Sequence, residues 1–156
     1  MKPAVKLIIS IAIPLAIGAI ASLFTSASVN GWYTTIYKPS FNPPNWIFAP
    51  VWTGLYIMMG IAFYLIWKSH PDENVKNRAI DLYLLQLAFN FLWSFIFFYL
   101  HQPGWALVDI IALWIAILLT IVSFGKISVT AAWLLLPYIC WVSFAAILNF
   151  FIWKMN

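Results

Sequence analysis

The stretch VKLIISIAIPLAIGAIASLF, residues 5–24, is an apolar run in which Lys6 is the only charged residue. A bilayer core about 30 Å thick is crossed by a helix of about 20 apolar residues, so this run is long enough to span a membrane. The small residues that follow, 25–28, also fit a cleavage site, which makes a secretory signal peptide the competing interpretation. The run is long for a signal peptide, and we expect it to stay in the protein as its first membrane helix.

Comparable apolar runs follow along the rest of the chain, of which 65% is hydrophobic and 8% charged. Soluble domains are about 25% charged, so lipid is the main solvent of this protein. The predicted helices cover about residues 5–24, 47–67, 79–100, 105–124 and 128–153, with a kink at Pro137 in the last. We therefore predict an all-α fold, an integral membrane bundle of five transmembrane helices in which residues 1–156 form a single domain.

The longest loop between predicted helices, residues 25–46, combines prolines with aromatic residues. Pro39, Pro43 and Pro44 fix backbone torsion angles and lack amide donors, so a loop of this kind holds a shape with few hydrogen bonds. We interpret it as a stiff lid. The charged segment 68–78 is predicted to be the main polar loop, and residues 101–104 a tight turn.

Basic residues predict the orientation in the membrane, because Lys and Arg collect on the cytoplasmic side. Five crossings place the N-terminus on the same side as the 68–78 loop, opposite the 25–46 loop and the C-terminus. The first side holds Lys2, Lys6, Lys68, Lys76, Arg78 and Lys126, whereas the second holds only Lys38 and Lys154. We expect a multi-pass protein of the cell membrane with a cytoplasmic N-terminus and with the first loop and C-terminus outside.

Polar and tryptophan side chains gather in the predicted outer half of the bundle, beneath the 25–46 loop. Asp109, Asn149 and Trp52 fall near the outer ends of their helices, and Asn90 and Trp141 lie deeper. Such a set suits a small-molecule pocket, although interhelical hydrogen bonds and an interfacial tryptophan belt explain single residues equally well. Asn90 and Trp141 are too deep for a belt, which favours a pocket.

Several kinds of chemistry are disfavoured by the residues present. The basic residues are scattered singly, so no nucleic-acid partner is expected. His70 and His101 fall in loops on opposite sides, which excludes a bis-histidine haem within the bundle, and no spacing typical of a metal site is present. Cys140 has no second cysteine to pair with. We expect no metal and no required cofactor.

The segment WYTTIYKPSFNPPNWIFAPVWTGLY, residues 32–56, resembles the signature of the TspO/MBR family of tryptophan-rich sensory proteins and translocator proteins. The segments QLAFNFLWS, residues 86–94, and PYICWVSFAAILN, residues 137–149, are similar to the family as well. The resemblance extends over nearly the whole chain and identifies it as a bacterial-type member.

The resemblance implies a homodimeric five-helix bundle with a ligand pocket under the first loop. It implies porphyrins such as protoporphyrin IX, other hydrophobic molecules and, in animal members, sterols as ligands. Matched position by position, the ligand-binding residues it implies are Tyr33, Pro43, Ile47, Trp52, Asn90, Trp93, Trp141, Ala145 and Leu148. Trp52 and Trp141 match the tryptophans implicated in light-dependent porphyrin degradation.

One departure from the family concerns the sterol motif, which has a tyrosine before a terminal basic residue. Residues 148–154, LNFFIWK, offer phenylalanine instead, which removes a hydroxyl and makes cholesterol doubtful as the native ligand. Three functions stay open in this order: a porphyrin-binding receptor or sensor, a light-dependent catalyst of protoporphyrin degradation, and a transporter of porphyrins or small apolar molecules.

Overall fold

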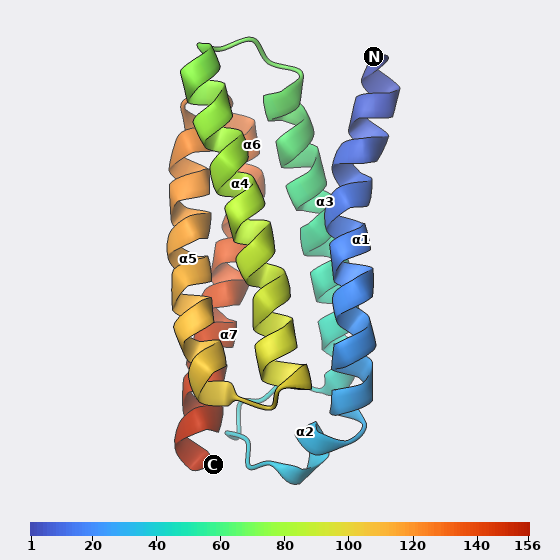
Figure 1. Ribbon diagram of the computed structural model, residues 1–156, viewed down its shortest axis with the longest axis vertical. Helices are drawn as coiled ribbons and strands as arrows, with labels where there is room; N and C mark the ends of the chain where they lie inside the picture. Colours follow the sequence, from blue (N-terminus) through green and yellow to red (C-terminus); the bar gives the residue numbers. More distant parts are fainter.

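The computed structural model describes residues 1–156 and contains only helices and the loops between them (Figure 1). Five of its helical segments are long and apolar enough to cross a membrane, as predicted. The elements are, in chain order, α1 (Pro3–Val29), α2 (Trp32–Thr35), η1 (Asn45–Ile47), α3 (Phe48–Trp67), α4 (Glu73–Ser94), η2 (Phe95–Tyr99), α5 (Pro103–Gly125), α6 (Val129–Leu134) and α7 (Leu136–Met155).

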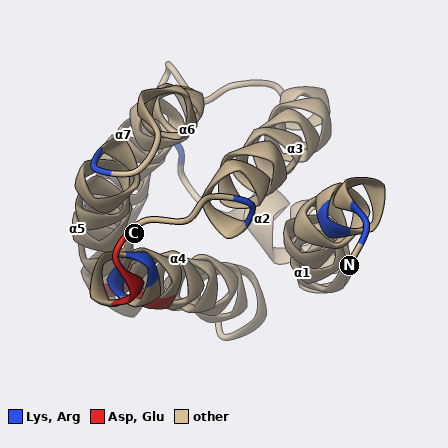
Figure 2. Ribbon diagram, turned by 90° about the horizontal axis from the view of Figure 1, so that it is seen from above, with Lys and Arg blue, Asp and Glu red and all other residues tan.

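The spans form a closed bundle in which each helix packs against its neighbours in space. α1 packs on α3 and on the α4–η2 span, α5 packs on α4 and α7, and α6 packs on α3. Viewed along the bundle, Lys, Arg, Asp and Glu lie mainly toward the ends of the helices (Figure 2). The N-terminus lies at one end of the bundle, and α2, its flanking loops and the C-terminus lie at the other (Figure 1).

α1 is an integral wall of this bundle, as expected of a membrane helix that stays in the protein. It packs closely on α3 at Gly60, where an added Cβ would lie 2.5 Å from the Cα of Ile11 and 2.7 Å from the carbonyl oxygen of Ser10. Gly18 meets the ring of Tyr56 in the same way. Glycine at these two positions lets the helix backbones pack closely, as small residues do between membrane helices.

Two predicted loops are shorter than the sequence suggested. α1 continues through Thr25–Val29, so the first loop comprises residues 30–44, called the lid below, and includes α2. α4 begins at Glu73, because the carboxylate of Asp72 accepts a hydrogen bond from the Asn74 amide at 2.9 Å and caps the helix. The prediction of a polar loop over 68–78 was therefore wrong beyond residue 72.

The last span is interrupted near Pro137, as predicted. α6 ends at Leu134 and α7 begins at Leu136, with the proline in the first turn of α7, where its missing amide donor leaves no hydrogen bond unmade.

Candidate ligand-binding cavity

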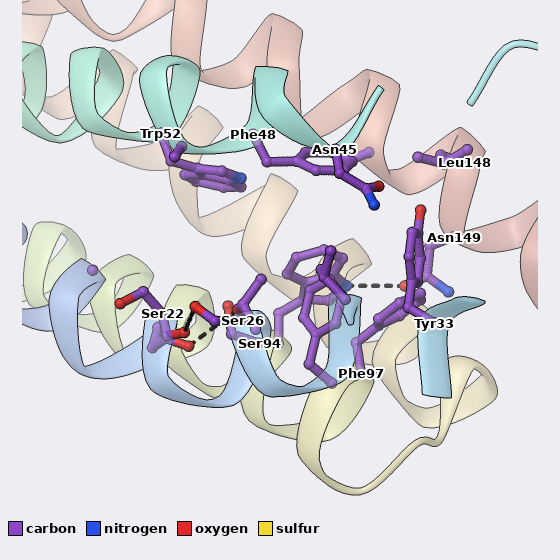
Figure 3. A pocket seen from close by; sticks show the side chains of 18 of the residues that line it. Ser22, Ser26, Tyr33, Asn45, Phe48, Trp52, Ser94, Phe97, Leu148 and Asn149 are labelled. Atoms are coloured by element: carbon purple, nitrogen blue, oxygen red, sulfur yellow. Dashed lines mark hydrogen bonds between the residues drawn. The ribbon is translucent and has the colours of Figure 1, made fainter. Parts of the chain in front are cut away.

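A cavity of about 330 Å³ lies inside the bundle at the lid end. It is lined by α1, α3, the α4–η2 span and α7 (Figure 3), and by Asn30 and Tyr33 of the lid. The lining residues are Gly18, Ala21, Ser22, Thr25, Ser26, Val29, Asn30, Tyr33, Asn45, Phe48, Ala49, Trp52, Tyr56, Trp93, Ser94, Phe97, Phe98, Trp141, Phe144, Ala145, Leu148, Asn149 and Ile152. None of them carries a formal charge.

Aromatic rings from α3, the α4–η2 span and α7 form a large part of the wall. The Trp52 ring stacks on Tyr56 with centroids 5.6 Å apart, so its plane is held by a residue one turn along α3. Phe48 meets Trp141 of α7 edge to face at 6.4 Å. These contacts fix the rings in place before any ligand arrives, which reduces the ordering cost of binding.

The α4–η2 span contributes Trp93, Ser94, Phe97 and Phe98 to the cavity. After Ser94 the helix widens to π geometry, with the Leu100 amide donating to the Phe95 carbonyl at 3.0 Å, and π segments occur frequently at functional sites. The Trp93 ring stacks on Phe97 at 5.4 Å. The π turn therefore brings several aromatic side chains to the cavity from one short segment.

The lid is held over the cavity through Tyr33, which is 2% exposed. Its hydroxyl donates to the Asn42 side-chain oxygen at 2.8 Å, and burial raises the pKa of that hydroxyl to about 12. The Lys38 ammonium lies 4.7 Å from the centre of the Tyr33 ring and donates to the Tyr33 carbonyl at 2.7 Å. These interactions give the lid a fixed shape, as its proline content predicts.

The C-terminal residue of the chain also holds the lid in place. The Asn156 side chain accepts a hydrogen bond from the Tyr37 amide at 3.1 Å and donates to the Tyr37 carbonyl at 2.9 Å. Trp32 stacks on His101 with centroids 4.5 Å apart. The lid is thus tied to α7 and to the turn before α5.

A buried polar network lies below the cavity, where α3, α4 and α7 meet. The Tyr56 hydroxyl donates to the Asn90 side-chain oxygen at 3.0 Å, and the Asn90 amide nitrogen donates to the Tyr138 hydroxyl at 2.8 Å. Tyr138 in turn donates to Gln86 at 2.7 Å. The network satisfies polar groups that lipid cannot, and it fixes the floor of the cavity.

Asn149 links α7 to α4 and α5 at the side of the cavity. Its side-chain oxygen accepts from the Trp93 indole at 2.9 Å (Figure 3), and its nitrogen donates to the Pro103 carbonyl at 2.8 Å. By contrast, the Trp141 indole nitrogen and both carboxyl oxygens of Asp109 are buried without a partner. Trp141 lines the cavity with its ring, whereas its indole nitrogen has no accessible surface there and is enclosed by packed neighbours.

The structure brings most of the predicted ligand-binding residues to this cavity: Tyr33, Trp52, Trp93, Trp141, Ala145 and Leu148. Asn90 lies behind Tyr56 in the floor network, so it positions a lining residue. Pro43 and Ile47 do not line the cavity. Contact of any of these residues with a ligand stays a prediction.

Sequence reasoning missed the contribution of α1 to the wall, which includes the hydroxyl residues Ser22, Thr25 and Ser26. Their spacing of three and four residues is the signal that places them on one helix face. Phe97, Phe98 and Asn45 were missed because no sequence pattern revealed the π turn or the start of η1.

The fold and the cavity define a class: a multi-pass helical membrane protein with an aromatic, uncharged pocket beneath a fixed lid. The TspO/MBR family profile matches residues 10–154. The chain is 44% identical over 155 residues to the tryptophan-rich protein TspO of Chlorobaculum tepidum, covering 99% of this chain and 98% of the relative. It is 48% identical over 151 residues to the protein of that name from Archaeoglobus fulgidus, covering 97% of each.

The human translocator protein is 40% identical over 138 residues, which cover 88% of this chain and 82% of the relative. The chain belongs to the TspO/MBR family of membrane proteins.

Proposed function

We propose that the protein is a membrane receptor, or sensor, that binds porphyrins such as protoporphyrin IX and other hydrophobic ligands in this cavity. The lining itself carries the proposal: aromatic rings from α3, η2 and α7 surround the space, and no lining residue is charged. Flat aromatic walls suit a flat apolar macrocycle, and a few fixed polar groups orient it.

The cavity is not closed on all sides. Ser22 and Ser26 of α1, Asn45 of η1 and Ala49 of α3 line it and are exposed, so its edge opens between α1 and the start of α3. A tetrapyrrole larger than the enclosed 330 Å³ would extend through this opening. Its apolar ring then contacts the aromatic wall, while any group that stays ionised lies outside the cavity.

Titration of the purified protein in detergent with protoporphyrin IX in the dark tests the proposal. We expect saturable quenching of tryptophan fluorescence, because Trp52, Trp93 and Trp141 line the cavity. Quenching that rises linearly, and equally in protein unfolded by denaturant, would show that the porphyrin only partitions into the micelle and would refute a receptor role.

Light-dependent degradation of bound protoporphyrin is the second candidate function. It is favoured by one observation: Trp52 and Trp141, the tryptophans that the family resemblance implicates, line the same cavity. In that function they donate electrons to the excited macrocycle or to the reactive oxygen it produces.

Loss of porphyrin absorbance under light tests this second function. We expect Trp52→Phe and Trp141→Phe to slow the loss while dark binding continues. Trp105→Phe is the matched control, because Trp105 is 68% exposed and does not line the cavity. Equal rates of absorbance loss in all the variants would show that Trp52 and Trp141 take no part in the reaction.

The orientation that we propose places the N-terminus in the cytoplasm and the lid outside, following the distribution of basic residues. In a Cys140→Ser background, Ser40→Cys in the lid would be labelled by an impermeant thiol reagent from outside. Labelling only in permeabilised cells would reverse this orientation and place the lid in the cytoplasm. A homodimer and transport of porphyrins stay predictions.

A further inference from the structure

The interior of the cavity offers nothing to neutralise an ionised ligand group. Its only titratable lining residues are Tyr33 and Tyr56, and their hydroxyls donate to Asn42 and Asn90. An unpaired carboxylate in such a site is strongly disfavoured, because it loses its hydration and gains no opposite charge. Any ligand group that enters the interior is therefore uncharged.

One side of the cavity is nevertheless polar, and we call it the hydroxyl wall: Ser22, Thr25 and Ser26 of α1 together with Ser94 of α4. Ser22 and Ser26 donate to the carbonyls of Ala19 and Ser22, both at 2.6 Å, and Thr25 donates to that of Ala21 at 3.1 Å. Their protons are engaged by the helix, so their oxygens are left as acceptors.

Ser94 differs from the other members of the hydroxyl wall. It is 8% exposed, it lines the cavity, and its hydroxyl forms no hydrogen bond within the chain. Figure 3 shows it on the same side as Ser22 and Ser26, across the pocket from Trp52 and Phe48. A buried hydroxyl facing a cavity without a partner is a donor that a ligand can satisfy.

We propose that the hydroxyl wall is a polar subsite for an uncharged group that both donates and accepts hydrogen bonds, with Ser94 as its specificity-determining donor. A protonated carboxyl, a hydroxyl or a primary amide has this chemistry. The inference rests on the proposed function. For a porphyrin, the ring packs on Trp52 and Phe48 while one propionic acid, protonated, lies against the hydroxyl wall.

The test compares protoporphyrin IX with its dimethyl ester, followed by porphyrin fluorescence in the dark. The ester has no titrating carboxyl, so it reports any pH effect that arises in the protein or the micelle. We expect affinity for the free acid to fall at least about tenfold between about pH 5 and pH 7, as its carboxyl groups ionise, and affinity for the ester to stay level.

Substitution at Ser94 tests the donor. We expect Ser94→Ala to weaken binding of both probes about three- to tenfold, the effect of one neutral hydrogen bond, and Ser94→Thr to retain wild-type affinity. Thr53→Val is the control, because it removes a helix hydroxyl outside the cavity: the Thr53 hydroxyl donates to the Ala49 carbonyl at 2.7 Å, and Thr53 does not line the cavity.

The outcomes separate the two proposals. Binding of both probes with no effect of Ser94→Ala, or free-acid affinity that does not change with pH, overturns the hydroxyl wall as the subsite and leaves the receptor standing. Absence of saturable binding by either probe overturns the receptor and the subsite together. Equal unfolding temperatures for Ser94→Ala and Ser94→Thr show that any difference in affinity is not a folding defect.

Discussion

Asn90 is the junction of the polar network under the cavity, and its replacement tests what the network contributes to stability. Its amide accepts from Tyr56 at 3.0 Å and donates to Tyr138 at 2.8 Å. Asn90→Leu removes both groups and leaves the Tyr56 hydroxyl without an acceptor, in a side chain that is 6% exposed.

The two broken bonds have different costs. A buried donor left unpaired costs about 1–3 kcal/mol, which applies to Tyr56. The Tyr138 hydroxyl still donates to Gln86 at 2.7 Å, so it loses only one hydrogen bond between membrane helices, worth about 0.6 kcal/mol. We expect Asn90→Leu to lower the free energy of unfolding by roughly 2–3 kcal/mol.

Reversible unfolding in mixed micelles, followed by tryptophan fluorescence, measures this change. Adding Tyr56→Phe to Asn90→Leu removes the orphaned hydroxyl and should recover about half of the loss, because replacing both partners costs less than replacing one. A loss below about 0.6 kcal/mol for Asn90→Leu, or a deeper loss in the double variant, would refute the reasoning.

Three further predictions concern other parts of the chain. Asp109→Leu should raise the free energy of unfolding by about 1–3 kcal/mol, because both carboxyl oxygens are buried without partners; a lower value in the same assay would contradict this. Gly60→Ala should destabilise by about 1–3 kcal/mol, because the new methyl group would meet α1. Gly54→Ala is its control, since a Cβ there has no atom within 4 Å, and equal effects would exclude close packing as the cause. The pKa of Tyr33 is about 12 in the folded lid against 10.0 for a free tyrosine, so stability from its buried hydroxyl is complete below pH 10.0 and is lost as pH rises toward 12. Subtilisin cleavage of the lid should accelerate over that interval in the wild type and not in Tyr33→Phe; acceleration in both would assign the effect to another group.

The number of spanning helices was predictable because apolar runs of sufficient length leave few alternatives. Helix ends were less predictable, because capping and packing decide them. Thr25–Val29 reads as a loop from its small polar residues, yet it continues α1, where the Thr25 and Ser26 hydroxyls bond to the helix's own carbonyls. Asp72 caps α4, but it lies in a charged segment that was predicted to be a loop.

The candidate site was predictable where it depends on the family resemblance and on depth in the membrane. Trp52 and Trp141 were placed in a pocket, and both line the cavity. Ser94 falls in the segment that matches the family but was not predicted to bind a ligand, because its place at the cavity depends on how α4 packs in the bundle, which no sequence pattern specifies.

Filling the cavity tests most directly whether it is the porphyrin site. Ala145 is 8% exposed and lines the cavity, so Ala145→Phe places a ring inside it; Ile147→Phe, at a 53% exposed position on the same helix, is the matched control. In dark titrations with protoporphyrin IX dimethyl ester, the account predicts that Ala145→Phe loses saturable binding while Ile147→Phe binds like the wild type. Wild-type affinity in a folded Ala145→Phe protein would contradict it, because the porphyrin would then bind elsewhere.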